Sequence, residues 1–198
     1  MRERASTRDR SLTPMIGVVL AGGASKRMGQ DKAGVDVAGR PMISWVVDAL
    51  AEVADRVLVA GRLGAWNGHE VIADVEGVAG PLSGLAAALA LGQPVLLVAV
   101  DQPWLRSATL AHLVSIGQTV VPVQDETRQV TCAVYYPAYA DLVHKASSLQ
   151  GLFDMEAPLE ITEPVWRAWG EDGRSWFSVD RPEDVGVGLD RFGVPGQP

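Results

Sequence analysis

The sequence predicts an α/β protein, a single domain in which helices cover both faces of a mostly parallel central sheet. Apolar, strand-like runs alternate along the chain with amphipathic, helix-like runs. The strongest strands, 16–21 and 94–100, are apolar throughout, as expected of strands buried on both faces. The 198 residues are enough for one well-buried core and few for two.

The first half of the chain is expected to contain three strands and two helices. The strand 16–21 leads into a glycine-containing, charged loop, 22–40. Pro41 then opens a helix, because proline suits the first turn and the following apolar residues recur on one stripe. The strand 56–60 and a weaker strand, 69–73, come next, and they are followed by a helix that runs from Gly80 to Gly92.

The second half begins with the buried strand 94–100 and a helix with Ser107 as its N-cap. Further on we expect strands at 119–123, 129–136 and 175–180, and helices at 138–149 and from 181. The expected boundaries are a domain at 15–192, a disordered lead-in at 1–14 and a loose tail at 193–198.

Composition excludes several functions. The net charge of −7 argues against a nucleic-acid partner, which normally requires a basic face. A single cysteine, Cys132, cannot form an internal disulfide or a zinc site, and its apolar surroundings indicate a buried thiol. No apolar stretch is long enough to span a membrane, so we expect a cytoplasmic protein without a membrane partner.

The loop after the first strand, within "VVLAGGASKRMGQDK" (18–32), indicates a phosphate-binding site. Gly22 and Gly23 allow a tight turn and a close approach of ligand atoms to the backbone. Lys26, Arg27 and Lys32 gather positive charge in an acidic chain, and a triphosphate fits that combination. The alternative is a solvated basic turn whose glycines serve geometry alone.

The same loop lacks the patterns of the two commoner phosphate loops. It has no G-x-G-x-x-G, which argues against an NAD-dependent oxidoreductase, and no G-x-x-x-x-G-K-[ST].

The stretch "LAGGASKRMGQDK" closely resembles the signature L-A-G-G-x-S-x-R-M-G-x-D-K of the nucleotidyltransferases. Within these it is most similar to the molybdenum cofactor guanylyltransferases. The resemblance implies a Rossmann-like fold of the nucleotide-diphospho-sugar transferase type. It also implies that Leu20, Ala21 and Gly22 contact base and ribose, that Gly23 and Arg27 embrace the phosphates, and that Lys32 binds the nucleotide.

A candidate metal ligand, Asp101, ends the strand in "VLLVAVDQP". A carboxylate at this position suits Mg²⁺ on a triphosphate, because Mg²⁺ takes one or two carboxylates together with waters and phosphate oxygens. The alternative is an aspartate that caps the next helix. By resemblance Asp101 is the Mg²⁺ ligand.

Two further segments resemble parts of the same family. "GPLSG" matches the family's G-P-L-x-G, which places Gly80 beside the nucleotide, and Asp74 matches a nucleotide-contacting aspartate. "WFSVDRPED" resembles a late family segment, although Ser178 and Asp180 replace its usual asparagines. Asp180 is therefore a candidate metal or acceptor-site residue, with helix capping as the alternative.

The sequence departs from the guanylyltransferases at Gly61, where an asparagine is common, and at Val130-Thr131, where a proline-containing pair is usual. The first departure bears on which base the protein recognises, and the second bears on which acceptor it uses. We assign Gly61 to the nucleotide site.

The resulting hypothesis is nucleotidyl transfer. An acceptor phosphate attacks the α-phosphorus of the nucleotide and pyrophosphate leaves, with Arg27, Lys32 and Asp101 as the catalytic residues. By resemblance the donor is GTP, the acceptor is molybdopterin carrying molybdenum, and molybdoenzymes or cofactor-delivery proteins are transient partners. The alternatives are a transferase that uses CTP, phospholactate or a sugar phosphate, and a non-catalytic nucleotide-binding regulator.

Overall fold

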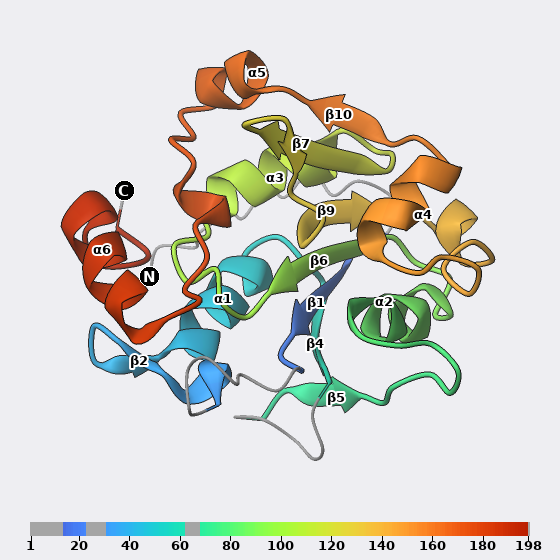
Figure 1. Cartoon of the computed structure of the whole chain (residues 1–198), viewed down its shortest axis with the longest axis horizontal. Helices are drawn as coiled ribbons and strands as arrows, with labels where there is room; N and C mark the ends of the chain where they lie inside the picture. Colours follow the sequence, from blue (N-terminus) through green and yellow to red (C-terminus); the bar gives the residue numbers. More distant parts are fainter. Residues whose placement is uncertain (1–13, 23–30, 62–67, 198) are drawn as a thin grey trace, which may run out of the picture.

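The computed structural model describes residues 14–22, 31–61 and 68–197. Within these ranges the main sheet has eight strands (Figure 1). These are β1 (Ile16–Leu20), β4 (Arg56–Ala60), β5 (Glu70–Ile72), β6 (Val95–Ala99), β7 (Val120–Gln124), β8 (Thr127–Arg128), β9 (Cys132–Tyr135) and β10 (Leu159–Ile161). The α-helices are α1 (Met42–Ala51), α2 (Pro81–Leu89), α3 (Ser107–Ser115), α4 (Leu149–Met155), α5 (Glu163–Ala168) and α6 (Pro182–Phe192).

The strand order of the sheet is β10-β7-β9-β6-β1-β4-β5, with β8 paired to β7. β1 pairs in parallel with both β4 and β6, and Leu20 lies opposite Ala60 on one side and Ala99 on the other. β9 is antiparallel to β6 and β7. The carboxyl ends of β1, β4 and β6 therefore meet at one edge, the position where parallel sheets bind ligands.

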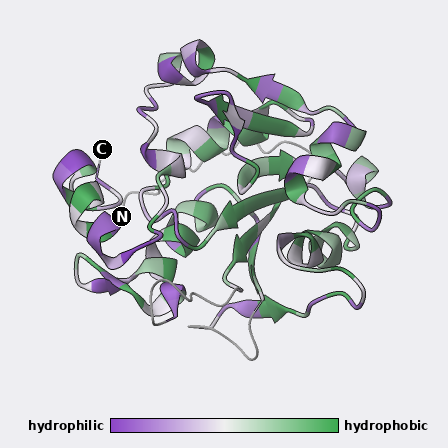
Figure 2. Cartoon of the chain, in the orientation of Figure 1, coloured by the Kyte–Doolittle hydropathy of each residue, from purple (hydrophilic) through white to green (hydrophobic). Residues whose placement is uncertain are grey.

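Helices cover both faces of the sheet, which confirms the predicted three-layer α/β class. Val18 and Leu97 pack in one buried cluster with α2 and α4, whereas Val19 and Leu96 pack in a second cluster with α1 and α3. This alternation follows from the period of two along a strand. Figure 2 shows the central strands hydrophobic along their length, as strands buried on both faces must be.

A third, smaller cluster joins the segment that follows β1 in the described chain to the C-terminal helix. It contains a two-stranded hairpin, β2 (Asp36–Val37) and β3 (Arg40–Pro41), together with α6. Trp104 lies at its centre, 2% exposed, and its indole Nε1 donates a hydrogen bond to the carbonyl of Gly193 at 2.8 Å. A Cβ on Gly188 would lie 2.1 Å from the Trp104 ring, so this helix glycine allows α6 to pack there.

Three local predictions were wrong. The range 138–149 forms a short 3-10 turn, Pro137–Tyr139, and then further turns, and α4 begins only at Leu149. Ser148 sets that start, because its Oγ accepts a hydrogen bond from the backbone N–H of Gly151 at 2.9 Å. Ser107 is the first residue of α3 and the N-cap is Arg106, which makes no side-chain cap.

The predicted strand 175–180 is also absent. Its first part belongs to a 3-10 turn, Arg174–Trp176, and the rest runs alongside the loop that follows β6. The backbone N–H of Val179 donates to the carbonyl of Asp101 at 2.8 Å. Its hydrogen bond therefore goes to a loop, which no local sequence pattern could indicate.

Cys132 is fully buried in β9, as expected, and burial raises the pKa of its thiol. Across the described ranges, the structure contains no helix long and apolar enough to cross a membrane.

Candidate active site

The site begins where β1 and β4 end. The backbone N–H of Ala21 donates to the carbonyl of Ala60 at 2.9 Å, and Val100 N–H donates to Leu20 O at 3.1 Å. These bonds extend the sheet by one residue past the regular strands. They fix the points at which the segments after β1 and β6 leave the sheet and enter the site.

Gly22 and Gly61 touch each other backbone to backbone at this point. A Cβ built on Gly61 would lie 2.5 Å from the Gly22 Cα, and one built on Gly22 would lie 2.8 Å from the Gly61 Cα. Gly61 also has a φ of +80°, which side chains rarely adopt. Glycine is therefore required at both positions, which explains why this chain carries no side chain at position 61.

A cavity of about 380 Å³, the Gly61 cavity, opens beside this contact. Its lining includes five predicted nucleotide residues, Leu20, Gly22, Gly61, Asp74 and Gly80. Gly80 is the N-cap residue of α2, and Pro81, Ser83 and Gly84 from the start of that helix also line the cavity.

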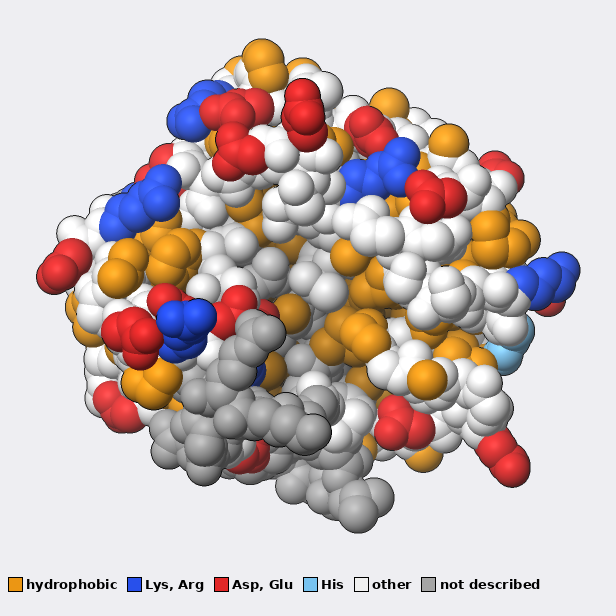
Figure 3. Space-filling view, viewed as in Figure 1, with side chains coloured by type: hydrophobic (Ala, Val, Ile, Leu, Met, Phe, Trp, Pro, Cys, Tyr) orange, Lys and Arg blue, Asp and Glu red, His pale blue; other side chains and the backbone are white. Residues whose placement is uncertain are grey.

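A second cavity of about 420 Å³, the Lys32 cavity, shares Leu20, Gly22 and Pro81 with the first. Its lining also includes Lys32 and Asp101. The two cavities thus form one continuous cleft beyond the carboxyl ends of β1 and β6. Figure 3 shows this face of the molecule hollowed near the carboxyl end of β6.

Lys32 joins two carboxylates at this cleft. Its Nζ lies 2.9 Å from Asp101 Oδ2 and 2.7 Å from Asp180 Oδ1. The side chains of Lys32 and Asp101 are 19% and 21% exposed. Burial lowers the pKa of the Lys32 ammonium, but the hydrogen bonds and charges of Asp180 and Asp101 outweigh that effect, so its pKa is raised above 10.5. Lys32 is therefore fully charged at neutral pH.

The structure brings together most of the predicted site residues. Leu20, Ala21, Gly22, Lys32 and Asp101 line the Lys32 cavity. Gly23 and Arg27 lie outside the described residues.

The capping alternatives for the two aspartates are wrong. The N-cap of α3 is Arg106 and that of α6 is Arg181, so neither Asp101 nor Asp180 caps the helix that follows it. Both carboxylates bond to Lys32 instead.

Sequence reasoning missed Gln102 and Gln129, which line the Lys32 cavity. Thr131 and Trp176, from the segments 130–131 and 176–184 that were compared with the family, also line it. Thr131 reaches the site because β9 runs antiparallel to β6, and its carbonyl accepts from Ala99 N–H at 2.9 Å. Adjacency to Asp101 was the one available signal, and it applied to Gln102 alone.

The donor set fits a divalent cation bound together with substrate. Within the described residues no three His, Cys, Asp or Glu side chains form a complete metal site. Mg²⁺ does not need one, since one or two carboxylates suffice when phosphate oxygens and waters supply the rest. Asp101 and Asp180 already direct oxygens at one cationic group, the ammonium of Lys32.

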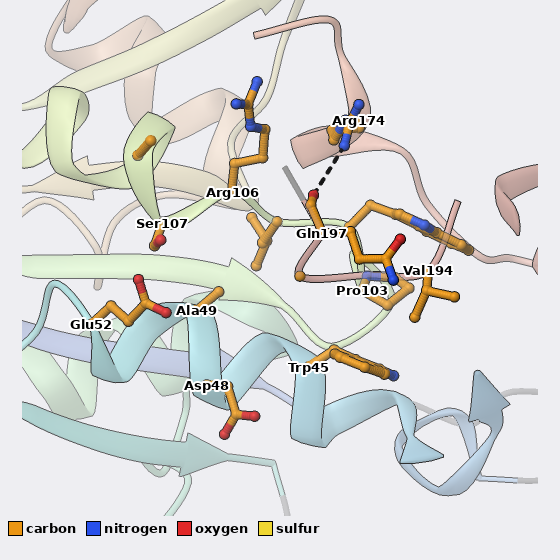
Figure 4. Close-up of a pocket in the computed structure, with 14 residues that line it drawn as sticks. Trp45, Asp48, Ala49, Glu52, Pro103, Arg106, Ser107, Arg174, Val194 and Gln197 are labelled. Atoms are coloured by element: carbon orange, nitrogen blue, oxygen red, sulfur yellow. Dashed lines mark hydrogen bonds between the residues drawn. The ribbon is translucent and has the colours of Figure 1, made fainter. Parts of the chain in front are cut away.

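A separate cavity of about 500 Å³, the Trp45 cavity, lies between α1, the start of α3 and the C-terminal segment (Figure 4). It contains none of the predicted site residues. Arg174 already pairs with Asp172 and donates to the carbonyl of Gln197, and Arg106 donates to the carbonyl of Gly170. Both arginines of its lining are therefore already engaged with other parts of the chain.

The fold and the cleft define a class, the α/β transferases that bind a nucleoside triphosphate beyond the carboxyl ends of parallel strands. Comparison with known sequences then gives the family. The chain belongs to the MobA-like NTP transferase domain family, whose profile matches residues 17–162. This confirms the resemblance carried by the loop after β1, and the protein is a nucleotidyltransferase.

Three similar proteins illustrate the family. A molybdenum cofactor biosynthesis bifunctional protein of Synechocystis is 30% identical over 168 residues, which cover 78% of this chain and 47% of that relative. A probable molybdenum cofactor guanylyltransferase of Deinococcus radiodurans is 39% identical over 186 residues, which cover 88% of this chain and 93% of that relative. The fold is shared with molybdopterin-guanine dinucleotide biosynthesis protein A of Archaeoglobus fulgidus, with a TM-score of 0.74, 23% identity, and 88% and 97% coverage.

We expect Lys32→Ala to raise the dissociation constant for the metal-bound nucleotide by about 10- to 100-fold, the effect of losing a charge-assisted hydrogen bond. Titration calorimetry checks this, with Lys145→Ala, on an exposed turn, as the control. Because the pKa of Lys32 is raised, its charge and its ion pairs persist below pH 10.5 and are lost as the pH rises through the folded value. An unchanged affinity would remove Lys32 from the site.

Proposed function

We propose that the protein transfers GMP from GTP to molybdopterin carrying molybdenum, in a Mg²⁺-dependent reaction that forms the guanine dinucleotide cofactor and releases pyrophosphate. The arrangement of Lys32 between Asp101 and Asp180, beside a glycine-lined cleft, is the observation that carries the proposal. The similarity to a molybdenum cofactor guanylyltransferase and to a molybdopterin-guanine dinucleotide biosynthesis protein supports this donor and acceptor.

The nucleoside fits the Gly61 cavity, in which backbone at Gly22 and Gly61 leaves room for a flat base. Asp74 contributes a carboxylate there, which accepts hydrogen bonds from base or ribose donors. The positive end of the α2 dipole favours the nearby phosphates.

Lys32 neutralises negative charge that develops on the departing pyrophosphate, and we assign the same role to Arg27. The acceptor phosphate is itself the nucleophile, so the protein need not supply one. Consistent with this, the described lining of the two cavities contains neither cysteine nor histidine. The residues then contribute orientation and electrostatic stabilisation.

MobA-like nucleotidyltransferases are generally dependent on a divalent metal. Asp101 and Asp180 would hold Mg²⁺ here, since they are the carboxylates already directed at a cation. When bound, the metal would supply positive charge that stabilises the negative charge of the phosphates. Asp180 has the place of an asparagine in the family segment, so the second carboxylate is a feature of this chain.

A transferase that uses CTP is the second candidate, because Gly61 removes one feature that supports guanine. The guanylyltransferases often have an asparagine there, whereas the contact with Gly22 excludes any side chain in this protein. The base is therefore selected by the other residues of the Gly61 cavity.

Pyrophosphate release from GTP, CTP, ATP and UTP, measured with Mg²⁺ and with or without molybdenum-loaded molybdopterin, tests the proposal. We expect release only with GTP and the acceptor together. Release with CTP alone among the nucleotides would move the protein to the cytidylyl transferases. Tight GTP binding without turnover on molybdopterin, phospholactate or a sugar phosphate would indicate a regulator.

A further inference from the structure

A buried carboxylate, Glu171, lies outside the cleft. Glu171 follows α5 and is 2% exposed. It is not a ligand of the cleft, because neither cavity includes it in its lining. Glu171 lies where α3 meets the segment 172–176, so its role is structural and not direct binding of a ligand.

Both carboxylate oxygens of Glu171 are fully used as acceptors. Oε2 accepts from Thr109 Oγ1 at 2.6 Å and from Ser175 Oγ at 2.6 Å. Oε1 accepts from the backbone N–H groups of Asp172 at 3.0 Å, Gly173 at 2.7 Å and Ser175 at 3.3 Å. Five donors from two separate parts of the chain therefore converge on one side chain.

The contacts connect the start of α3 to the segment that enters the site. Thr109 lies in the first turn of α3, and Ser175 Oγ also accepts from the backbone N–H of Arg106 at 3.0 Å. At the other end Val179 N–H donates to Asp101 O at 2.8 Å. The loop 101–106 and the segment 171–180 are thus joined at both ends.

That segment carries Trp176 and Ser178, which line the Lys32 cavity, and Asp180, which pairs with Lys32. After the 3-10 turn Arg174–Trp176 it has no regular structure and pairs with no strand of the sheet. Its position therefore comes from the packing of Trp176 and Val179 in two buried clusters and from a few specific hydrogen bonds, which fix its orientation. The bonds of Glu171 are the largest such group on one side chain.

We infer that Glu171 is a positioning residue that holds Trp176, Ser178 and Asp180 in place against Asp101. An apolar side chain would fill the same space, but it could not fix the direction of five donors at once. Where the inference concerns the acceptor, it rests on the proposed function. Glu171 itself touches no reacting atom.

A matched pair of variants at Thr109 tests this with little risk to folding. Thr109→Val keeps the shape and removes the hydroxyl that bonds to Glu171, whereas Thr109→Ser keeps that hydroxyl. Glu171→Gln is the stronger change, because its NH₂ group must face donors in either orientation of the amide. If Glu171→Gln fails to fold, the Thr109 pair still decides the question.

We expect Thr109→Val to raise KM for molybdenum-loaded molybdopterin about tenfold, while the dissociation constant for GTP measured without Mg²⁺ changes less than about twofold, because Asp180 would contact the nucleotide through the metal. Thr109→Ser should restore the wild-type KM. Amide hydrogen exchange of peptides covering 174–180, measured without acceptor, should become about tenfold faster in Thr109→Val and not in Thr109→Ser.

Two results would overturn the inference. One is unchanged exchange of 174–180 in both Thr109→Val and Glu171→Gln. The other is equal weakening of GTP and acceptor, with faster exchange throughout the protein, which would mean a general loss of stability. If the wild-type protein does not turn over molybdopterin, the proposed function fails, whereas the exchange experiment still decides the role of Glu171.

Discussion

Asp101→Asn is expected to lower kcat by about a thousandfold, the magnitude of losing a principal electrostatic group from an active site. The substitution retains the size of the side chain but removes the charge that pairs with Lys32 and would bind the metal. The carbonyl of Asp101, which accepts from Val179 N–H, is unaffected, so the neighbouring segment should stay in place. The loss should therefore appear in turnover and not in folding.

Pyrophosphate release at saturating GTP and Mg²⁺ measures this effect, and thermal unfolding verifies the fold. Asp154→Asn provides a matched control, because Asp154 pairs with Arg128 at a side-chain exposure of 72%, and no described cavity includes it. Retention of more than a tenth of wild-type kcat by Asp101→Asn would contradict the role given to this carboxylate.

Gly61→Ala should both destabilise the protein and prevent nucleotide binding. The new Cβ would lie 2.5 Å from the Gly22 Cα and 2.6 Å from the Gly22 nitrogen, and neither backbone atom can rotate away. The φ of +80° adds the ordinary strain of a side chain in the left-handed region. Together these effects should lower the free energy of unfolding by about 2–5 kcal/mol.

The control for Gly61→Ala is Gly77→Ala. Gly77 has nearly the same φ, +79°, but a Cβ there would meet no atom within 4 Å. Gly77→Ala should lower the free energy of unfolding by only about 1 kcal/mol. The difference between the two variants then measures the steric overlap with Gly22 apart from the backbone strain. Denaturant unfolding and calorimetric titration with GTP compare the two variants. Equal losses in both would show that the contact with Gly22 does not matter.

The elements around the cleft could be predicted because their signals are local. β1 and β6 are continuous apolar runs, and Gly22 follows the first of them directly. The helix predicted at 138–149 was wrong, because this range forms turns and the hydroxyl of Ser148 caps a helix that begins only at Leu149. Asp180 shows the limit most clearly, since its partner Lys32 lies 148 residues away in the sequence.

By itself the sequence determined the α/β class, the glycine-lined turn after β1 and the aspartate at the end of β6. These features depend on side-chain periodicity and backbone freedom within a few neighbouring residues. Only the tertiary structure decided that Asp180 pairs with Lys32 and that the backbones of Gly61 and Gly22 are in contact. It also decided that Glu171 connects the segment 171–180 to α3 through hydrogen bonds. Such pairings arise when distant segments pack together, and a linear pattern cannot specify which partners will meet.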